Sequence, residues 1–314
     1  MTGKMIAILG AGAMGSAYAA RFAEAPDCKT VLVARGERRD RLAREGIVVN
    51  DVTYRLSVVH PEEVAEPADL ILVALKHHHL PGAVGDLRVL VGPETTILSV
   101  MNGLDSEEIL GAVYGMDKVL YTVAVGIDAV REGNRVTHTK PGTLYYGEAT
   151  NDPPSERVRR VGALLDRAGI AHETPPDMIR TLWWKFMINV GVNQASAAVR
   201  APYGTFQTSP EAQALMETLM REVIVLAEAE GVDLGEQDIR AWYDFMNGLS
   251  PEGKTSMLQD VEAGRKTEVE MFAGKVVELG AKRGIATPVN ETLLHIIHVL
   301  EEQAGTRRTM DDGR

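Results

Sequence analysis

A short apolar run near the N-terminus leads directly into a glycine-rich turn and then an alanine-rich stretch. Residues 4–9 read KMIAIL and residues 10–15 read GAGAMG, the G-x-G-x-x-G spacing of a strand, turn and helix that bind a dinucleotide. In that pattern Gly10 permits the tight turn, Gly12 lets the main chain approach a pyrophosphate, and Gly15 lets the helix pack closely on the strand. The first N–H groups of the helix then hold phosphate oxygens. We therefore expect the cofactor to contact the whole turn: Gly10, Ala11, Gly12, Ala13, Met14 and Gly15.

The residue that follows the second expected strand, 29–34, indicates which dinucleotide binds. About 20 residues beyond the glycines, an NAD site usually carries Asp or Glu against the ribose 2′-hydroxyl. This chain has Arg35 there, followed by Arg38, Arg39 and Arg41. Because a guanidinium pairs with phosphate through forked hydrogen bonds, Arg35 predicts NADPH rather than NADH. The alternative is that the run is the solvated start of a helix, which is the interpretation we favour for Arg41.

The composition favours a soluble enzyme that acts on a small molecule. With 314 residues the chain can bury two cores, and its formal charge of −11 argues against nucleic acid or an anionic membrane as a partner. The single cysteine, Cys28, forms no internal disulfide and has no second cysteine for a metal site. No apolar run approaches the roughly 18 residues that cross a bilayer. We expect a cytoplasmic protein with no metal, no nucleic-acid partner and no membrane span.

Strand and helix patterns alternate along the first half of the chain, as a parallel sheet requires. Residues 46–59 suggest a hairpin excursion from that sheet. After a strand over 119–127, the segments 135–139 and 143–146 suggest an antiparallel addition to it. Two further runs are continuously apolar, which is typical of strands covered on both faces: 69–75 and 95–100.

The pattern changes after the prolines at 175 and 176. Beyond Ile179 helical periods dominate, with almost no strand-like alternation. The expected fold class is therefore α/β, with an N-terminal, doubly wound Rossmann-type sheet and a C-terminal all-α domain. We expect domains at 1–175 and 176–305 and a polar, disordered tail at 306–314.

The first long helix expected in the second half, over 183–194, carries one narrow polar stripe. Lys185, Asn189 and Asn193 are spaced i, i+4 and i+8 among apolar residues, so they share a face. Lysine is seldom buried without a partner, which suggests a functional cleft. Apolar surroundings would lower its pKa and make it a better proton donor near neutrality, and asparagine can bind a carbonyl or a hydroxyl. The alternative is an interhelical polar network that only sets packing.

A third cluster, at 256–268, gains its meaning in combination with the lysine helix. Ser256 alone would be a helix cap, and Glu268 alone would be a solvated carboxylate. Together with the earlier motifs, they make the chain resemble the ketopantoate reductase (2-dehydropantoate 2-reductase) family over nearly its whole length. The motifs that carry the resemblance are the glycine turn, Arg35, Leu75-Lys76, Met101-Asn102-Gly103-Leu104, Lys185 with Asn189 and Asn193, Ser256-Met257-Leu258-Gln259-Asp260, and Thr267-Glu268.

The resemblance implies NADPH-dependent reduction of 2-dehydropantoate to (R)-pantoate, in the synthesis of pantothenate and coenzyme A. It implies that Lys185 is the general acid that protonates the ketone oxygen. Asn189, Asn193 and Ser256 would orient the hydroxyl and carboxylate groups of the substrate. Glu268 would complete the catalytic site near the nicotinamide ribose or the substrate.

The resemblance also implies cofactor contacts at the carboxyl edge of the sheet. Asn102 would touch both cofactor and substrate, and Lys76 would touch the cofactor. Ala129 matches a main-chain contact to the cofactor in the family. The partner is thus a small 2-oxo acid, and the apolar helical half is compatible with a homodimer.

Two departures from the family pattern bear on the substrate. His77, His78 and His79 follow the cofactor lysine, and Tyr203 stands in a turn where family members often carry Asn. Three consecutive residues cannot face one metal from one helix face, so we do not expect these histidines to bind a metal. We expect them instead to line or cover the cofactor cleft.

Two other functions stay open. The chain could be a sister NADP-dependent reductase of another branched or aromatic 2-oxo acid, or a non-catalytic NADP sensor. A sensor would have no reason to keep Lys185, Asn189, Asn193 and Glu268 together.

Overall fold

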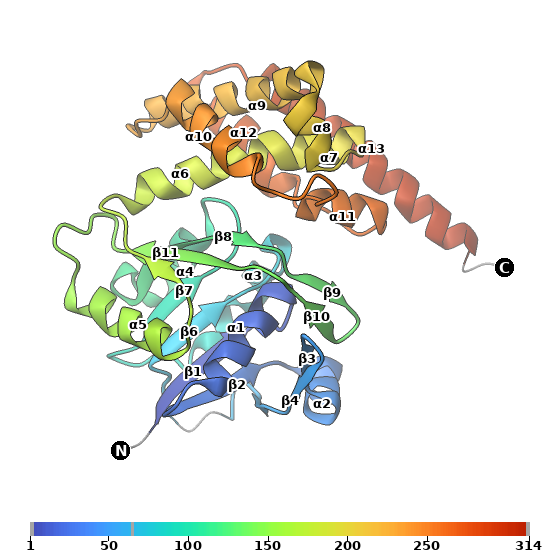
Figure 1. The fold of residues 1–314 in the computed structure, drawn as a ribbon. Helices are drawn as coiled ribbons and strands as arrows, with labels where there is room; N and C mark the ends of the chain where they lie inside the picture. The colour runs from blue at the N-terminus through green and yellow to red at the C-terminus, as the bar shows by residue number, and fades with distance from the viewer. Residues whose placement is uncertain (1–2, 64–65, 312–314) are drawn as a thin grey trace. The chain divides into compact units, whose positions relative to one another are not determined.

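The computed structural model describes residues 3–63 and 66–311, with side chains to residue 304. The chain divides into two compact units, residues 1–182 and 183–314 (Figure 1). The first unit is a mixed α/β structure and the second is helical, so the expected fold class is confirmed. The division between the units lies a few residues beyond the expected boundary at 175.

The main sheet of the first unit has eight strands in the order β12-β11-β8-β7-β6-β1-β2-β5. The strands from β5 to β8 in this order pair in parallel, whereas β11 runs antiparallel to β8, as 143–146 predicted. The central strands follow the order of a doubly wound sheet. The bounds are β1 Lys4–Leu9, β2 Cys28–Val33, β5 Ser57–Val59, β6 Leu70–Val73, β7 Thr96–Ser99, β8 Val119–Ile127, β11 Pro141–Gly147 and β12 His172–Glu173.

Both faces of this sheet are buried, because successive side chains point to opposite sides. Ile6 and Ile8 of β1 enter one core, while Ala7 and Leu9 enter the other. Helices α1 and α5 cover the first face, and α4 with the short helices after β6 covers the second. The helical bounds are α1 Ala13–Glu24, α2 Gly36–Glu45, η1 His77–His79, α3 Leu80–Ala83, η2 Val84–Leu87, α4 Ser106–Tyr114, η3 Met116–Lys118 and α5 Glu156–Arg167.

A second, four-stranded sheet has the order β4-β3-β10-β9. Its strands β3 (Ile47–Val49) and β4 (Val52–Tyr54) form the expected hairpin, whose turn residues Asn50 and Asp51 have φ of 46° and 66°. Strand β10 (Arg135–Thr137) pairs with β9 (Val130–Glu132) and β3. The expectation that 135–139 extends the main sheet is therefore wrong. The partner of β10 lies far away in the sequence, where local patterning cannot show it.

The second unit is built from helices, and none of its described residues forms a strand. The helix expected over 183–194 is interrupted, because a π-helix replaces its α-helical bonding from Asn189 onward. The bounds are α6 Met178–Ile188, η4 Asn189–Asn193, α7 Gln194–Val199, α8 Tyr203–Thr208, α9 Pro210–Ala229, α10 Glu236–Met246, α11 Ser256–Glu262, η5 Glu270–Gly274, α12 Lys275–Arg283 and α13 Pro288–Asp311.

The stretch 306–314, expected to be a disordered tail, falls partly on α13, whose backbone is helical to Asp311. Residues 312–314 lie outside the described residues. Of the helices that the structure describes, none is both long and apolar enough to cross a bilayer.

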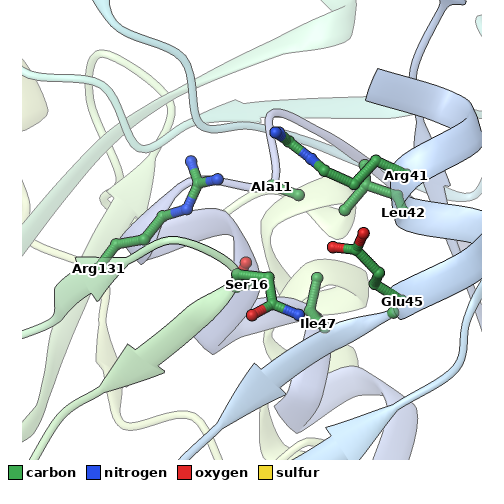
Figure 2. Close-up of a pocket in the computed structure, with 9 residues that line it drawn as sticks. Ala11, Ser16, Arg41, Leu42, Glu45, Ile47 and Arg131 are labelled. Atoms are coloured by element: carbon green, nitrogen blue, oxygen red, sulfur yellow. The ribbon is translucent and has the colours of Figure 1, made fainter. Parts of the chain in front are cut away.

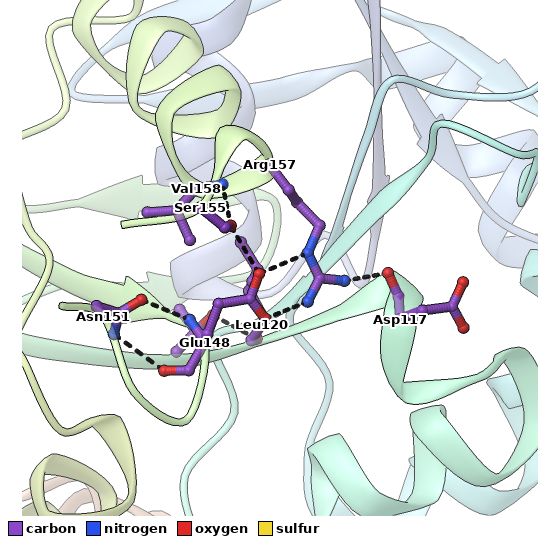
Figure 3. A network of polar contacts seen from close by, with 8 residues as sticks. Asp117, Leu120, Glu148, Asn151, Ser155, Arg157 and Val158 are labelled. Carbon is purple, nitrogen blue, oxygen red and sulfur yellow. Dashed lines mark hydrogen bonds and ion pairs between the residues drawn. The ribbon is translucent and has the colours of Figure 1, made fainter. Parts of the chain in front are cut away.

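A polar network around Glu148 ties the turn after β11 to the start of α5 (Figure 3). The Glu148 carboxylate accepts hydrogen bonds from Ser155 Oγ at 2.8 Å and from Arg157 Nε at 3.0 Å, and Arg157 also donates to the Asp117 carbonyl. Ser155 caps α5 by accepting from Val158 N at 3.2 Å. Burial alone would raise the pKa of Glu148, but the hydrogen bonds from Arg157 and Ser155 outweigh it and lower that pKa.

We predict that Arg157→Gln lowers the free energy of unfolding by about 1–3 kcal/mol, because it leaves a partly buried carboxylate without its charged donor. Glu148 contributes this stability above its unfolded pKa of about 4.3, and the contribution disappears as pH falls through its lower folded pKa. The decrease in unfolding free energy caused by Arg157→Gln should therefore be smaller at pH 3 than at pH 7. Urea unfolding of both proteins at the two pH values measures this difference.

Arg160→Gln on the same helix is the matched control, because its ion pair with Glu94, at 2.8 Å, is exposed. We expect it to change the unfolding free energy by less than about 1 kcal/mol. An equal loss in both variants would contradict a special role for the Glu148 network.

Candidate functional site

The glycine turn joins β1 to α1 with its free amides uncapped. Gly10 has a φ of +104°, which L side chains rarely adopt, and Gly12 is the N-cap residue of α1. No side chain caps the first turn of the helix, so its N–H groups can donate hydrogen bonds to an anion. This turn has the local geometry of a phosphate cradle.

The space around each glycine shows which glycines the packing of the fold requires and which leave room beside the main chain. A Cβ on Gly10 would lie 2.4 Å from Ala74 O, and one on Gly15 would lie 1.9 Å from Gly10 O. These two glycines are required by the fold itself. A Cβ on Gly12 would meet only Ala74 O, at 3.9 Å, so the chain has room for a side chain there. The open space at Gly12 is what close approach of a pyrophosphate to the main chain requires, so the turn fits a dinucleotide.

The other expected cofactor residues of this unit follow neighbouring strands. Lys76 comes shortly after β6 and is the N-cap residue of the short helix η1, while Asn102 comes shortly after β7, before Gly103 with its φ of +98°. Ala129 lies between β8 and β9 and packs against the core. Because β1, β6, β7 and β8 are parallel, their carboxyl ends lie along one edge of the sheet. The structure thus brings Lys76, Asn102 and Ala129 to the same edge as the glycine turn.

A buried carboxylate, Glu107, which sequence reasoning missed, is linked by hydrogen bonds to the carboxyl end of β7. Ser99 Oγ lies 2.8 Å from Ser106 Oγ, which in turn lies 2.8 Å from Glu107 Oε2. Burial raises the pKa of Glu107 to about 7. Its signal in the sequence is the acidic pair Glu107-Glu108, and such a pair near a helix start, here that of α4, usually marks a solvated terminus.

Arg35 lies at the expected place, two residues beyond the end of β2, but its guanidinium already has acidic partners. Its Nη2 lies 2.6 Å from Asp86 Oδ1 and its Nη1 lies 3.6 Å from Glu62 Oε1. Arg38 instead turns toward the glycine turn and donates to Ala11 O at 2.8 Å. The end of β2 is therefore cationic, as predicted, but its first arginine is charge-paired.

A small pocket beside Ala11 collects further cations (Figure 2). Ala11, Ser16, Arg41, Glu45 and Arg131 are among the residues that line it. The sequence suggests that Arg41 belongs to the solvated start of a helix. In the structure it also lines the pocket beside Ala11. Sequence reasoning missed Arg131, whose only signal was its place two residues beyond the family contact at Ala129.

Lys185 lies in the last turn of α6 and is partly buried. Burial lowers its pKa from 10.5 to about 8, and no charged group among the described residues offsets this effect. A lysine with such a pKa holds a proton at neutral pH and can release it readily. This is the protonation behaviour of a general acid.

The π-helix η4 contains the next two residues of the polar stripe. Asn189 and Asn193 are only 4% and 6% exposed. A Cβ on Gly191 between them would lie 2.6 Å from the Met220 side chain, so glycine lets this segment pack closely on α9. Single π-helical turns occur frequently at functional sites. Packing of η4 on α9 thus fixes the position of the segment that carries the Asn189 and Asn193 side chains.

The remaining expected residues lie on neighbouring parts of the same unit. The helix cap of α11 is Thr255, which accepts from Leu258 N at 3.2 Å, so the suggestion that Ser256 caps it is wrong. Ser256 is the first helical residue and is exposed. Glu268 is partly buried and directly precedes Val269, the N-cap residue of η5, and both α11 and η5 pack against η4. Ser256 and Glu268 therefore lie on or beside elements that both pack against η4, the element that carries Asn189 and Asn193.

The histidines at 77–79 form the 3₁₀ helix η1, with His78 and His79 exposed. Among the described side chains, no group of three or more His, Cys, Asp or Glu residues is placed to hold a metal ion.

Comparison with known proteins bears on both units. A family model described as ketopantoate reductase PanE/ApbA matches residues 6–151, and one described as the C-terminal part of ketopantoate reductase PanE/ApbA matches residues 177–301. A 2-dehydropantoate 2-reductase from Streptococcus pyogenes is 25% identical over 302 residues, covering 95% of this chain and 98% of that protein.

Solved structures share the fold over almost the full length. D-mandelate dehydrogenase with NADH and anilino(oxo)acetate has a TM-score of 0.87 at 21% identity, covering 96% of this chain and 99% of that one. A dimeric ketopantoate reductase from Staphylococcus aureus has a TM-score of 0.77 at 22% identity, with the same coverage.

The glycine geometry predicts different outcomes for two matched substitutions. Gly12→Ala should fold with nearly unchanged thermal stability but bind a nicotinamide dinucleotide at least tenfold more weakly, because the methyl group enters the space of the pyrophosphate. Gly15→Ala should be destabilised by more than about 1 kcal/mol, because its Cβ overlaps Gly10 O. Calorimetry and a fluorescence titration measure both. Full affinity in a folded Gly12→Ala variant would contradict the assignment of this turn.

Proposed function

The chain belongs to the ketopantoate reductase PanE/ApbA family, and from that premise we propose that it reduces 2-dehydropantoate to (R)-pantoate with NADPH. At family level it is an oxidoreductase that acts on a 2-oxo acid with a nicotinamide cofactor. The more specific activity would place it in the synthesis of pantothenate and coenzyme A.

The observation that carries this proposal is the state of Lys185. Lys185 is partly buried, has a pKa of about 8 and forms no ion pair with another described residue, and a lysine perturbed in this way is typical of a functional site. Reduction of a ketone needs a proton at the oxygen, and such a lysine supplies one at neutral pH.

When bound, the nicotinamide supplies a hydride to the carbonyl carbon. Lys185 donates a proton from Nζ to the carbonyl oxygen, so the product carries a hydroxyl group. Before the transfer, its positive charge also stabilises the negative charge that develops on that oxygen. Lys185 is left neutral and recovers its proton from solvent.

Buried amides would orient the substrate. The Asn193 side chain makes no hydrogen bond to another described residue although it is 6% exposed, which is unusual for a buried amide. We assign Asn193, Asn189 and Ser256 to the hydroxyl and carboxylate groups of the substrate. Glu268 would complete this site, Asn102 would touch both cofactor and substrate, and Lys76 would touch the cofactor.

The preference for NADPH rests on the cations around the end of β2. No acidic residue directly follows this strand, and arginines occupy positions 35, 38, 39 and 41. This composition supports recognition of a 2′-phosphate rather than a free ribose hydroxyl.

A sister reductase of an aromatic or branched 2-oxo acid is the second candidate. The fold is shared with a D-mandelate dehydrogenase solved with NADH and anilino(oxo)acetate. Tyr203, at the start of α8, packs on Gly253 and replaces a small polar residue of the family pattern. The dimeric relative from Staphylococcus aureus supports a homodimer, which light scattering would test.

The substrate is tested by following NADPH oxidation with 2-dehydropantoate beside phenylglyoxylate and branched 2-oxo acids. We expect kcat/KM for 2-dehydropantoate to exceed the others by at least tenfold. A preference for phenylglyoxylate would replace the proposal by the second candidate. Tight NADPH binding without any turnover would instead indicate a sensor.

The pH dependence tests the role of Lys185. Since the protonated form is the acid and its pKa is about 8, kcat/KM for ketone reduction should be constant below pH 7 and fall tenfold per unit well above pH 8. Lys185→Ala should lower kcat by about 10²- to 10⁴-fold and lose this dependence. Lys282→Ala, at an exposed lysine of the same unit, is the control and should keep the wild-type profile. An unchanged profile in Lys185→Ala would refute the assignment.

A further inference from the structure

A chain of buried polar side chains joins the π-helix η4 to helices α9 and α13. Asn290, on α13, and Gln194 are both 0% exposed, and Gln194 directly follows Asn193, the last residue of η4. Gln194 Nε2 donates to Asn290 Oδ1 at 2.9 Å and to Val190 O, inside η4, at 2.8 Å. One side-chain amide therefore links the start of α13 to a main-chain oxygen of the segment that carries Asn189 and Asn193.

The carboxylate of Glu222, on α9, fixes the direction of this chain. Its oxygens accept from Val289 N at 2.9 Å, from Asn290 N at 3.0 Å and from Asn290 Nδ2 at 2.7 Å. An ionised carboxylate only accepts hydrogen bonds, so the Asn290 amide presents its nitrogen to Glu222 and its oxygen to Gln194. Gln194 must then present its own nitrogen to Asn290, and the same nitrogen reaches Val190 O. Neither amide can turn over without losing these bonds.

The bond to Val190 O replaces one that the π-helix removes from the main chain. In a continuous α-helix the main-chain N–H of Gln194 would donate to Val190 O, four residues earlier. In this structure that N–H donates to Gly191 O, and η4 has the wider bonding of a π-helix. The side chain of Gln194 thus satisfies the carbonyl that its own main-chain N–H has left, and this bond stabilises the π-helical form.

Gln194 is not the residue that packing alone would favour. Its Oε1 is buried and has no hydrogen-bond partner among the described residues. A buried oxygen without a partner costs folding free energy, whereas an apolar side chain of similar size would bring no such oxygen into the core. The glutamine is therefore explained by the two acceptors that its nitrogen holds.

The form of η4 decides the direction of its polar side chains. An α-helix and a π-helix hold different numbers of residues per turn, so conversion of η4 to an α-helix would rotate Asn193 relative to Lys185. We infer that Gln194, held by Asn290, is a positioning residue that keeps η4 in its π-helical form and thereby orients Asn193 toward the substrate. This inference rests on the proposed function, in which Asn193 binds a 2-oxo acid beside Lys185.

Steady-state kinetics of Gln194→Met tests the inference, with saturating NADPH and the 2-oxo acid that the wild type reduces fastest. Methionine has nearly the size of glutamine but no donor, so Val190 O loses its side-chain partner. We expect KM for the acid to rise about tenfold, the effect of losing about one hydrogen bond to the substrate, and by a larger factor than kcat falls. Partial unfolding would instead lower kcat and leave KM unchanged. The dissociation constant of NADPH should change less than twofold.

Gln207→Met is the matched control. The Gln207 side chain of α8 also donates to two main-chain oxygens, Met246 O at 2.9 Å and Leu249 O at 3.1 Å, but in a different segment of the unit. It should leave KM within twofold of the wild-type value. Hydrogen exchange of the η4 amides, measured without substrate, should be faster in Gln194→Met and unchanged in Gln207→Met.

Glu222→Gln is a milder second variant, for the case that Gln194→Met does not fold. It keeps the shape of the network but offers a nitrogen as well as an oxygen, so the Asn290 amide can turn over. It should raise KM about threefold. An unchanged KM in either folded variant would overturn the inference, as would an equal rise in Gln194→Met and Gln207→Met. A wild type that reduces no 2-oxo acid would refute the proposed function, and with it the role of Gln194 in orienting a substrate group, whereas unaltered kinetics of the variants beside an active wild type would refute the inference alone.

Discussion

Close packing of α1 on β1 is the constraint on which the dinucleotide unit depends. No side chain fits at Gly15, whose Cβ would overlap Gly10 O, so the helix must start at once after the strand. The uncapped N–H groups of α1 therefore lie at the carboxyl edge of the sheet, where the loops that follow β6 and β7 also begin. Strand order alone then brings Lys76 and Asn102 to the same edge.

The arginines near the glycine turn distinguish this edge of the sheet from the rest of an acidic protein. The chain carries a formal charge of −11, so polyanions are repelled from most of its surface. Arg38 and Arg131 escape neutralisation because main-chain oxygens, not carboxylates, hold them. Arg35, which follows the neighbouring strand β2, is instead paired with the Asp86 carboxylate. Counting arginines in the sequence therefore identifies a cationic region but not which guanidinium is available.

Local periodicity was enough to predict six of the eight strands of the main sheet, all but β5 and β12, together with the hairpin within 46–59 and the helical character of the second unit. It failed where a distant contact decides the structure. Strand β10 joins β3, and η4 becomes a π-helix where Gly191 meets Met220 of α9. Arg131 was missed for the same reason, since it reaches Ala11 only through the pairing of β9, β10 and β3. The types of residue in the candidate site were readable from spacing, but their pairing was not.

The isolation of Lys185 from other charges is what makes the helical unit suitable for acid catalysis. A carboxylate beside its ammonium group would raise the pKa and hold the proton after the hydride arrives. Full exposure would leave the pKa near 10.5, with the same result. Burial without a counterion lowers it to about 8, close to working pH, at a cost in folding free energy that the apolar packing of α6 and η4 must offset. In the function we propose, binding of an anionic 2-oxo acid supplies the missing charge, so the lysine gains a counterion only when substrate is bound.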